Sequence, residues 1–345
     1  MNRAQLWSLI IMVLCCGTVV LADNASEPKN PPIAMRATHL LGFEGARDNA
    51  NGMLSIQGEA LQFRKDRKPG VEIKIDSIQD VFVGEQSREI GGVPMTLGKA
   101  ATPYGGGRVV SLFAHKKYDT LSVQYMDADG GLHGAIFQLN KGQGEVFRNE
   151  LVSNGAHVAG VLAVVAGALP GRVAAQTVAT KSSITSLNLS SEIWSVQVSK
   201  VDPGDVHMDP SFQIAIYENL VDALNKTKRF ERVLREGDHS GAGVPNLLTL
   251  KTKVEKYTPG SETKRAVTTV GGATKLTVTS QLCTPDGAVV LKRTMSGNVR
   301  FIGSNLRATH NLAHNVAKVI QKSSLPEPSH SRKSGGASLT QNRGE

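Results

Sequence analysis

Residues 118–154 constrain the fold more than any other stretch of this sequence, because strand, turn, strand and helix patterns follow one another without a break. Apolar and polar residues alternate over 118–126, and successive side chains of a strand point to opposite faces, so this segment predicts a strand with one apolar face. Residues 127–131 hold aspartate and glycine, which tolerate the positive φ angles of a hairpin turn, and 132–139 predicts the returning strand. We expect the next helix to cover the apolar face of this hairpin, with Asn140 as its N-cap. The apolar residues that carry the pattern are Leu121, Val123, Tyr125, Val146, Phe147 and Leu151.

The chain has 345 residues, which is enough for two domains that each bury a core. Its N-terminus predicts export, because Arg3 is followed by a mostly apolar run over 6–20, and small or β-branched residues lead up to Ala22. We expect a signal peptide over 1–22, cleaved after Ala22, so that the mature protein is periplasmic or extracellular. A retained membrane anchor is the alternative, although the run is shorter than the roughly 20 residues of a membrane span.

Cysteine usage indicates how the mature chain is held together. Cys15 and Cys16 lie in the expected signal peptide, and lipidation at either stays open, although Leu14 is larger than the small residue that a bacterial lipidation site needs before its cysteine. After cleavage only Cys283 remains, and one cysteine forms no internal disulfide. The mature protein is therefore expected to be held by its hydrophobic cores.

The first half predicts a β-rich domain with one long loop. Short strands separated by turn residues run over 53–83, and Val71, Ile73 and Ile75 alternate with charged residues as in a sheet with one buried face. The loop over 85–107 is rich in glycine and holds two prolines. Long loops on a rigid scaffold often carry function, so this loop is a candidate binding site.

The order of these segments resembles a pleckstrin-homology-like (PH-like) barrel over residues 38–156, closed by the helix after the hairpin. The resemblance rests on residues 52–56, 61–63, 75–78 and 136–139. It implies a barrel that binds peptides, partner proteins or, in some members, phosphoinositides. The expected export favours a peptide or protein partner. The basic residues that a phosphoinositide would need are Arg64, Lys65, Arg67 and Lys68.

Residues 157–190 are expected to join two domains. The segment 158–169 consists of small apolar residues, which are too few to span a membrane. The Ser/Thr-rich run that follows it is typical of a linker. Whether 158–169 docks on a domain or on a membrane surface stays open, and any membrane association is expected to be weak.

The second half predicts an α/β domain over 191–322. Asp209 and Pro210 form a strong helix start, because aspartate caps free amide groups and proline suits the first helical position. Alternating strands indicate a meander sheet, and Ser304 can cap a last helix. This half resembles an uncharacterised family of bacterial envelope proteins, often lipoproteins, which is related in architecture to the curli-export and penicillin-binding-protein-activator lipoproteins. The resemblance implies no activity. The matching features are the strand at Ile193, the helix start at Asp209, residues 225–232, Tyr257 before Pro259, and the hairpin at Asp286.

The predicted fold class is therefore α+β, with an N-terminal PH-like β-barrel and closing helix, and a C-terminal α/β sandwich of a meander sheet with two helices. The predicted segments are a signal peptide over 1–22, a leader over 23–37, the PH-like domain over 38–156, an apolar segment and linker over 157–190, the envelope-family domain over 191–322 and a disordered tail over 323–345.

The sequence contains no recognisable catalytic, cofactor or metal motif. His310 and His314 are spaced to share a metal, but a zinc-protease motif needs a glutamate where Asn311 stands, so we expect both to pack at the boundary of the core. Cys283 lies beside a turn with no nearby histidine or basic helix end, which favours a strand-end residue over a nucleophile. We predict no cofactor and no metal, and favour binding over catalysis.

The formal net charge is +9, but the basic residues are spread along the sequence, so we expect a solvated basic surface instead of a nucleic-acid footprint. The leading hypothesis is a secreted bacterial envelope protein, without catalytic activity, that binds a protein or peptide at the barrel edge and the glycine-rich loop. A hydrolase with a site assembled from distant residues and a binder of an anionic polymer are the alternatives. The predicted binding residues are Gly91, Gly92, Pro94, Tyr104, Gly105, Gly106, Gly107 and Arg108.

Overall fold

The computed structural model describes residues 33–65, 69–90, 114–157, 193–261, 272–299 and 304–328. The expected signal peptide, most of the expected leader, the apolar segment 158–169 and the end of the tail lie outside these ranges. Within them, no helix combines the length and the apolar character that a membrane crossing requires.

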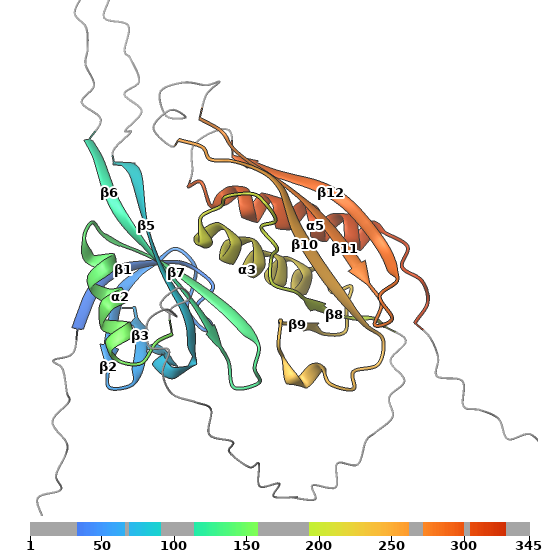
Figure 1. The fold of residues 1–345 in the computed structure, drawn as a ribbon, viewed down its shortest axis with the longest axis horizontal. Helices are drawn as coiled ribbons and strands as arrows, with labels where there is room; N and C mark the ends of the chain where they lie inside the picture. The colour runs from blue at the N-terminus through green and yellow to red at the C-terminus, as the bar shows by residue number, and fades with distance from the viewer. Residues whose placement is uncertain are drawn as a thin grey trace, which may run out of the picture. The chain divides into compact units, whose positions relative to one another are not determined.

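The first half folds into one seven-stranded sheet with the strand order β4-β3-β2-β1-β7-β6-β5 (Figure 1). All neighbouring strands pair antiparallel. The strands are β1 (Ile33–Leu41), β2 (Ala50–Gln57), β3 (Ala60–Arg64), β4 (Val71–Lys74), β5 (Ile78–Ile90), β6 (Ala114–Met126) and β7 (Leu132–Asn140).

The predicted PH-like barrel is wrong, because the described strands form an open sheet. β4 and β5 are its two end strands, and they do not pair with each other. β4 continues through the 3-10 turn η1 (Ile75–Ser77) into β5, which then pairs along its length with β6. An alternating pattern shows that a strand has one buried face, but not whether the ends of a sheet meet. The pattern was therefore equally compatible with an open sheet.

The hairpin and helix predicted over 118–154 are confirmed as β6, β7 and α2 (Gln143–Ser153). Phe147 and Leu151 of α2 are fully buried in the core of this sheet, whereas Val146 is 49% exposed and lies outside that interface. The N-cap is Gly142, with a φ of 82°, because Asn140 still belongs to β7. The periodicity thus predicted the helix correctly and its first residues incorrectly.

The first strand begins at Ile33, inside the segment 23–37 that we expected to be a leader. β1 lies between β2 and β7 in the sheet, and Ala37 is buried. The prolines that suggested a leader stop at Pro32, and apolar residues follow at alternate positions, as Ile33, Met35 and Ala37. The alternating pattern from Ile33 was therefore the better guide to where the strand begins than the proline content of the preceding residues.

The second half forms a five-stranded sheet with the order β12-β11-β10-β8-β9. Strands β10, β11 and β12 form the predicted antiparallel meander, but β8 pairs parallel with both β10 and β9, so the sheet as a whole is not a meander. Parallel neighbours need a crossover connection, which here contains a helix. The strands are β8 (Ser195–Val198), β9 (Val233–Leu234), β10 (Leu247–Thr258), β11 (Thr274–Cys283) and β12 (Val289–Val299).

Two helices, α3 (Pro210–Thr227) and α5 (Arg307–Lys322), lie on one face of this sheet (Figure 1). The predicted start of α3 is confirmed, because the Asp209 carboxylate accepts the Ser211 N–H at 2.8 Å and Pro210 is the first helical residue. Both helices bury their apolar faces in one cluster with the inward side chains of the strands, including Leu250, Val278 and Leu282.

The outer edge of β12 is partly covered by α5. The Asn311 and Asn315 side-chain amides donate to the carbonyl oxygens of Asn298 and Ser296, at 2.8 and 2.9 Å. These carbonyls therefore point away from β11. Because these outward carbonyls already accept hydrogen bonds from α5, they are less available to pair with a strand of another chain.

Candidate functional site

Residues 85–90 of the predicted glycine-rich loop belong to β5, so this strand runs further than expected. The rest of the loop, which holds the predicted binding residues, lies outside the described residues. Nothing in the structure tests Gly91, Gly92, Pro94, Tyr104, Gly105, Gly106, Gly107 or Arg108, and their role stays a prediction. The same holds for Arg67 and Lys68 of the first hairpin loop.

His310 and His314 are exposed on α5 and line a groove of about 320 Å³ between α5 and α3. Among the described residues, no group of three histidine, cysteine, aspartate or glutamate side chains could hold a metal ion. Cys283 is buried at the end of β11.

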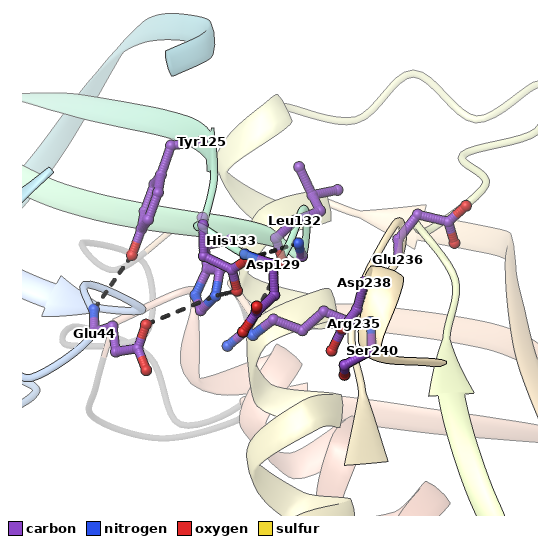
Figure 2. Close-up of polar contacts among 12 residues, drawn as sticks. Glu44, Tyr125, Asp129, Leu132, His133, Arg235, Glu236, Asp238 and Ser240 are labelled. Atoms are coloured by element: carbon purple, nitrogen blue, oxygen red, sulfur yellow. Dashed lines mark hydrogen bonds and ion pairs between the residues drawn. The ribbon is translucent and has the colours of Figure 1, made fainter. Parts of the chain in front are cut away.

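A polar pocket of about 460 Å³ gathers eight charged or titratable side chains, of which Glu218 and His133 are buried. The β1–β2 turn, the β6–β7 hairpin, α3 and the segment after β9 line it. Figure 2 shows polar contacts in the turn, the hairpin and the segment after β9, including those of Glu44 with Tyr125 and His133. Carboxylates outnumber cations in its lining, and burial raises the pKa of one of them, Asp48. The charged lining residues are Glu44, Asp48, Asp127, Glu218, Asp222, Asp238, Arg235 and His133.

A largely buried ion pair joins Glu218 of α3 to Arg235 in this pocket. Arg235 donates to both oxygens of the Glu218 carboxylate, at 2.8 and 2.9 Å. Arg235 also donates to the Leu132 carbonyl at 3.0 Å, and Glu218 accepts the Gly134 N–H at 2.7 Å. Burial opposes the charge of Arg235, but the hydrogen bonds and charge of Glu218 outweigh it and raise the pKa of the guanidinium. Through these hydrogen bonds to Leu132 and Gly134, the ion pair holds the backbone of the β6–β7 hairpin against α3.

Asp127 and His133 form a second polar contact at the ends of the same hairpin. The Nε2 atom of His133 lies 2.9 Å from one Asp127 oxygen, and the other oxygen accepts the N–H groups of Asp129 and Gly131 at 2.9 and 2.7 Å. The His133 ring stacks on Tyr125 with ring centroids 5.1 Å apart (Figure 2). These contacts close the hairpin turn, so the pair has a structural role.

A histidine and a carboxylate in a pocket would support a hydrolase only with a nucleophile in reach. The His133 Nδ1 atom is buried and has no hydrogen-bond partner among the described residues, and no described serine, threonine or cysteine joins the pair. The Tyr125 hydroxyl accepts the Glu44 N–H at 3.4 Å, and burial raises the pKa of this phenol further above its usual value. The pocket therefore lacks an activated nucleophile within the described part of the chain.

The pocket predicts an acid-dependent loss of stability. Burial alone would raise the pKa of Asp127, but the hydrogen bonds from Gly131, His133 and Asp129 outweigh it and hold the pKa below its usual value. A carboxyl with a lowered folded-state pKa stabilises the fold above its unfolded-state pKa of about 3.9, and this stabilisation is lost as the pH falls through the folded-state value. We expect the free energy of unfolding to decrease below about pH 4.

Denaturant titrations of the wild type and Asp127→Asn at several pH values measure this effect. The difference between the two proteins should be largest near neutral pH and should shrink in acid. An equal difference at neutral and acidic pH would show that the Asp127 charge does not contribute.

The opposite side of the second sheet, which faces away from α3 and α5, carries a group of lysines that we call the lysine face. Strand register places Lys251 of β10 beside Gln281 of β11, and Gln281 beside Lys292 of β12. The next rows are Lys253–Thr279–Thr294 and Lys256–Thr277–Ser296, and a further row holds Lys275. The lysine face is defined by Lys251, Lys253, Lys256, Lys275 and Lys292, all of which are exposed.

None of these five lysines forms an ion pair with a carboxylate of the described residues, whereas Lys117, Lys141 and Lys226 do. Glu255, at the bulge of β10, is exposed beside them, and Asp202 forms a backbone bridge with Lys253. Neighbouring strands lie about 5 Å apart, and alternate residues of one strand about 7 Å apart. The lysines are thus close enough to repel one another, because charges interact over about 10 Å at 0.1 M salt.

The side chains between the lysines are polar: Gln281 lies between Lys251 and Lys292, and the others are threonine and serine. The cross-strand pairs Thr279–Thr294 and Thr277–Ser296 each share a hydroxyl hydrogen bond of 3.0 Å. Tyr257, the aromatic residue of β10, packs against Phe212 of α3 with ring centroids 5.0 Å apart, and so points to the helix side. The described strands therefore offer charge on this face, but no aromatic ring on which a base or a sugar could stack.

Sequence reasoning missed this surface, because it searched for runs of basic residues along the chain. The five lysines are contributed by three strands and lie between positions 251 and 292. The signal that could have found them is the alternation of lysine with apolar residues in β10, combined with the register set by the hairpin at Asp286. The expectation of a scattered basic surface thus does not hold for this sheet.

No protein-family model and no curated protein matches this chain. Among solved structures, PelC from Paraburkholderia phytofirmans, crystallised as a dodecamer, matches with a TM-score of 0.30 and 16% identity over 38% of this chain and 90% of PelC. A candidate lipoprotein from Caulobacter crescentus matches with a TM-score of 0.21 and 17% identity over 36% of this chain and 84% of its own. Similarities at these TM-scores support no conclusion about function.

Proposed function

We propose that this protein is a non-catalytic binding module that recognises an anionic partner through the lysine face. The observation that carries the proposal is that five exposed lysines share one side of three neighbouring strands without an ion pair to a described carboxylate. Like charges at this spacing repel one another, and an anionic partner replaces that repulsion by attraction. The polar pocket, in contrast, uses its charges to hold its own elements together.

We also propose that the protein is exported and meets its partner in the cell envelope. This rests on the positively charged start, the apolar run over 6–20 and the small or β-branched residues at Val20 and Ala22. N-terminal sequencing of the protein from its native host should give Asp23 as the first residue. A cytosolic product that retains Met1 would contradict export.

Charge reversal on the lysine face tests the binding proposal. We expect the triple substitution K251E/K253E/K292E to weaken binding of fluorescently labelled polyglutamate by about 100-fold at low salt, since each exposed charge contributes on the order of 1 kcal/mol. Binding by the wild type should weaken steeply as salt is added, because exposed charges are screened. Fluorescence anisotropy across a salt series measures both effects.

The matched control is K74E/K318E/K322E, which changes the net charge equally at exposed lysines elsewhere on the described surface. It should bind polyglutamate nearly as well as the wild type. An equal loss in both triple variants would show that only the net charge matters. Absence of binding by the wild type would refute the proposal.

A further inference from the structure

We propose that the partner of the lysine face is the surface of an anionic phospholipid bilayer, on which the protein lies peripherally. This inference rests on the proposed function, and it names the partner. Three observations support it: the lysines are spread over two dimensions, the side chains between them are polar, and aromatic side chains are absent from the described face.

The first observation concerns shape. The lysines belong to three neighbouring strands, and cross-strand register places them in four successive rows, so they project from the sheet in one general direction. Neighbouring strands twist by only about 20–25° relative to one another, and the flexible lysine stems can compensate for this over three strands. Such an array can meet a plane of charge with all its members at once. A single linear polymer follows one row and meets fewer of them.

The second observation concerns the depth of contact. Between the lysines lie Thr277, Thr279, Thr294 and Ser296, which cannot bury apolar surface in the hydrocarbon region. Interfacial segments that insert into a bilayer carry large apolar side chains for that purpose. The lysine face is therefore suited to contact with headgroups, in which attraction comes from charge alone.

The third observation concerns magnitude. A lysine near an anionic membrane surface contributes about 1 kcal/mol, which corresponds to about fivefold in partitioning. Five lysines acting together, opposed by Glu255 and Asp202, are sufficient for reversible adsorption. Because surface potential decays within a Debye length, the binding must vanish at high salt.

Co-sedimentation of the full chain with vesicles tests the inference. We expect the wild type to bind vesicles of phosphatidylcholine and phosphatidylglycerol more tightly than vesicles of phosphatidylcholine alone, and to lose this preference at high salt. K251E/K253E/K292E should reduce partitioning to the anionic vesicles by about 100-fold, that is, by about fivefold for each lysine. The control K74E/K318E/K322E should retain it.

A second readout uses the wild type alone, so that it does not depend on how a variant folds. Lysine acetylation by a water-soluble ester, read by mass spectrometry, should slow at Lys251, Lys253 and Lys292 when anionic vesicles are added. Labelling of Lys74 and Lys318 should not change. Equal labelling of all these lysines with and without vesicles would overturn the inference.

The polyglutamate experiment separates the two proposals. If the lysine face binds polyglutamate but the wild type shows no preference for anionic vesicles, the bilayer is not the partner and the proposed function stands. If it binds neither probe, both proposals fail. Equal loss of vesicle binding in the two triple variants would also overturn the inference, because net charge alone would then explain the binding.

Discussion

Replacing Glu218 by alanine is expected to lower the free energy of unfolding by about 3–5 kcal/mol, because the substitution leaves the buried guanidinium of Arg235 without its counter-ion. Only 7% of the Glu218 side chain and 18% of the Arg235 side chain are exposed, so water cannot replace the lost carboxylate. The Gly134 N–H also loses its acceptor, and a buried unpaired donor is itself destabilising. Urea denaturation of the wild type and the variant measures the difference.

Two comparisons make this prediction specific. The double variant Glu218→Gln with Arg235→Met should be more stable than Glu218→Ala, because it removes the unpaired charge and keeps most of the side-chain volume. Asp222→Ala breaks the exposed i,i+4 pair with Lys226 on the same helix and should cost less than about 1 kcal/mol. If Glu218→Ala and Asp222→Ala cost the same, the buried pair does not hold the hairpin as described.

Replacing Gly42 by alanine should also be severely destabilising, by about 2–5 kcal/mol. Gly42 has a φ of 87°, which is unfavourable for a residue with a Cβ atom. An added Cβ would overlap the carbonyl oxygen of Gly134 and would lie 3.1 Å from Cγ of Glu218. Relief would require movement of the β7 backbone, which the Glu218 carboxylate holds in place. Thermal and urea denaturation measure the loss.

Gly58→Ala is the matched control for Gly42→Ala. Gly58 also has a positive φ, of 58°, but an added Cβ there would have no neighbour within 4 Å. Its cost should be limited to backbone strain, about 1–2 kcal/mol. The difference between the two variants therefore measures the close approach of the β1–β2 turn to β7. Equal costs would show that this approach is looser than the structure indicates.

Local patterns in the sequence predicted elements whose determinants lie within a few residues. Alternation and turn residues predicted the β6–β7 hairpin, and Asp209 with Pro210 predicted the start of α3. Local patterns failed where a neighbouring element decided the outcome. Asn140 was expected to cap α2 but is held in β7 by pairing with Tyr118, so Gly142 takes the cap position.

The candidate surfaces were harder to predict, because their residues meet only after folding. Gly134 and Glu218 are 84 residues apart, so the contact that fastens the hairpin to α3 gives no signal in either segment alone. The lysine face needs the register of two strand pairs to bring Lys251 and Lys292 to the same row. Of the glycine-rich loop that the sequence favoured as a binding site, residues 85–90 belong to β5 and residues 91–107 lie outside the described residues.

By itself the sequence determined the β6–β7 hairpin, the presence of α2 and the start of α3, since these follow from apolar spacing and turn or capping residues within a short stretch of chain. Tertiary structure decided that the first sheet stays open, that β8 joins the second sheet in parallel, and that five lysines share one surface. The physical reason is that alternation fixes a strand's faces but not its neighbours. Neighbours and register are set by long-range packing and backbone hydrogen bonding between segments that are distant in the chain.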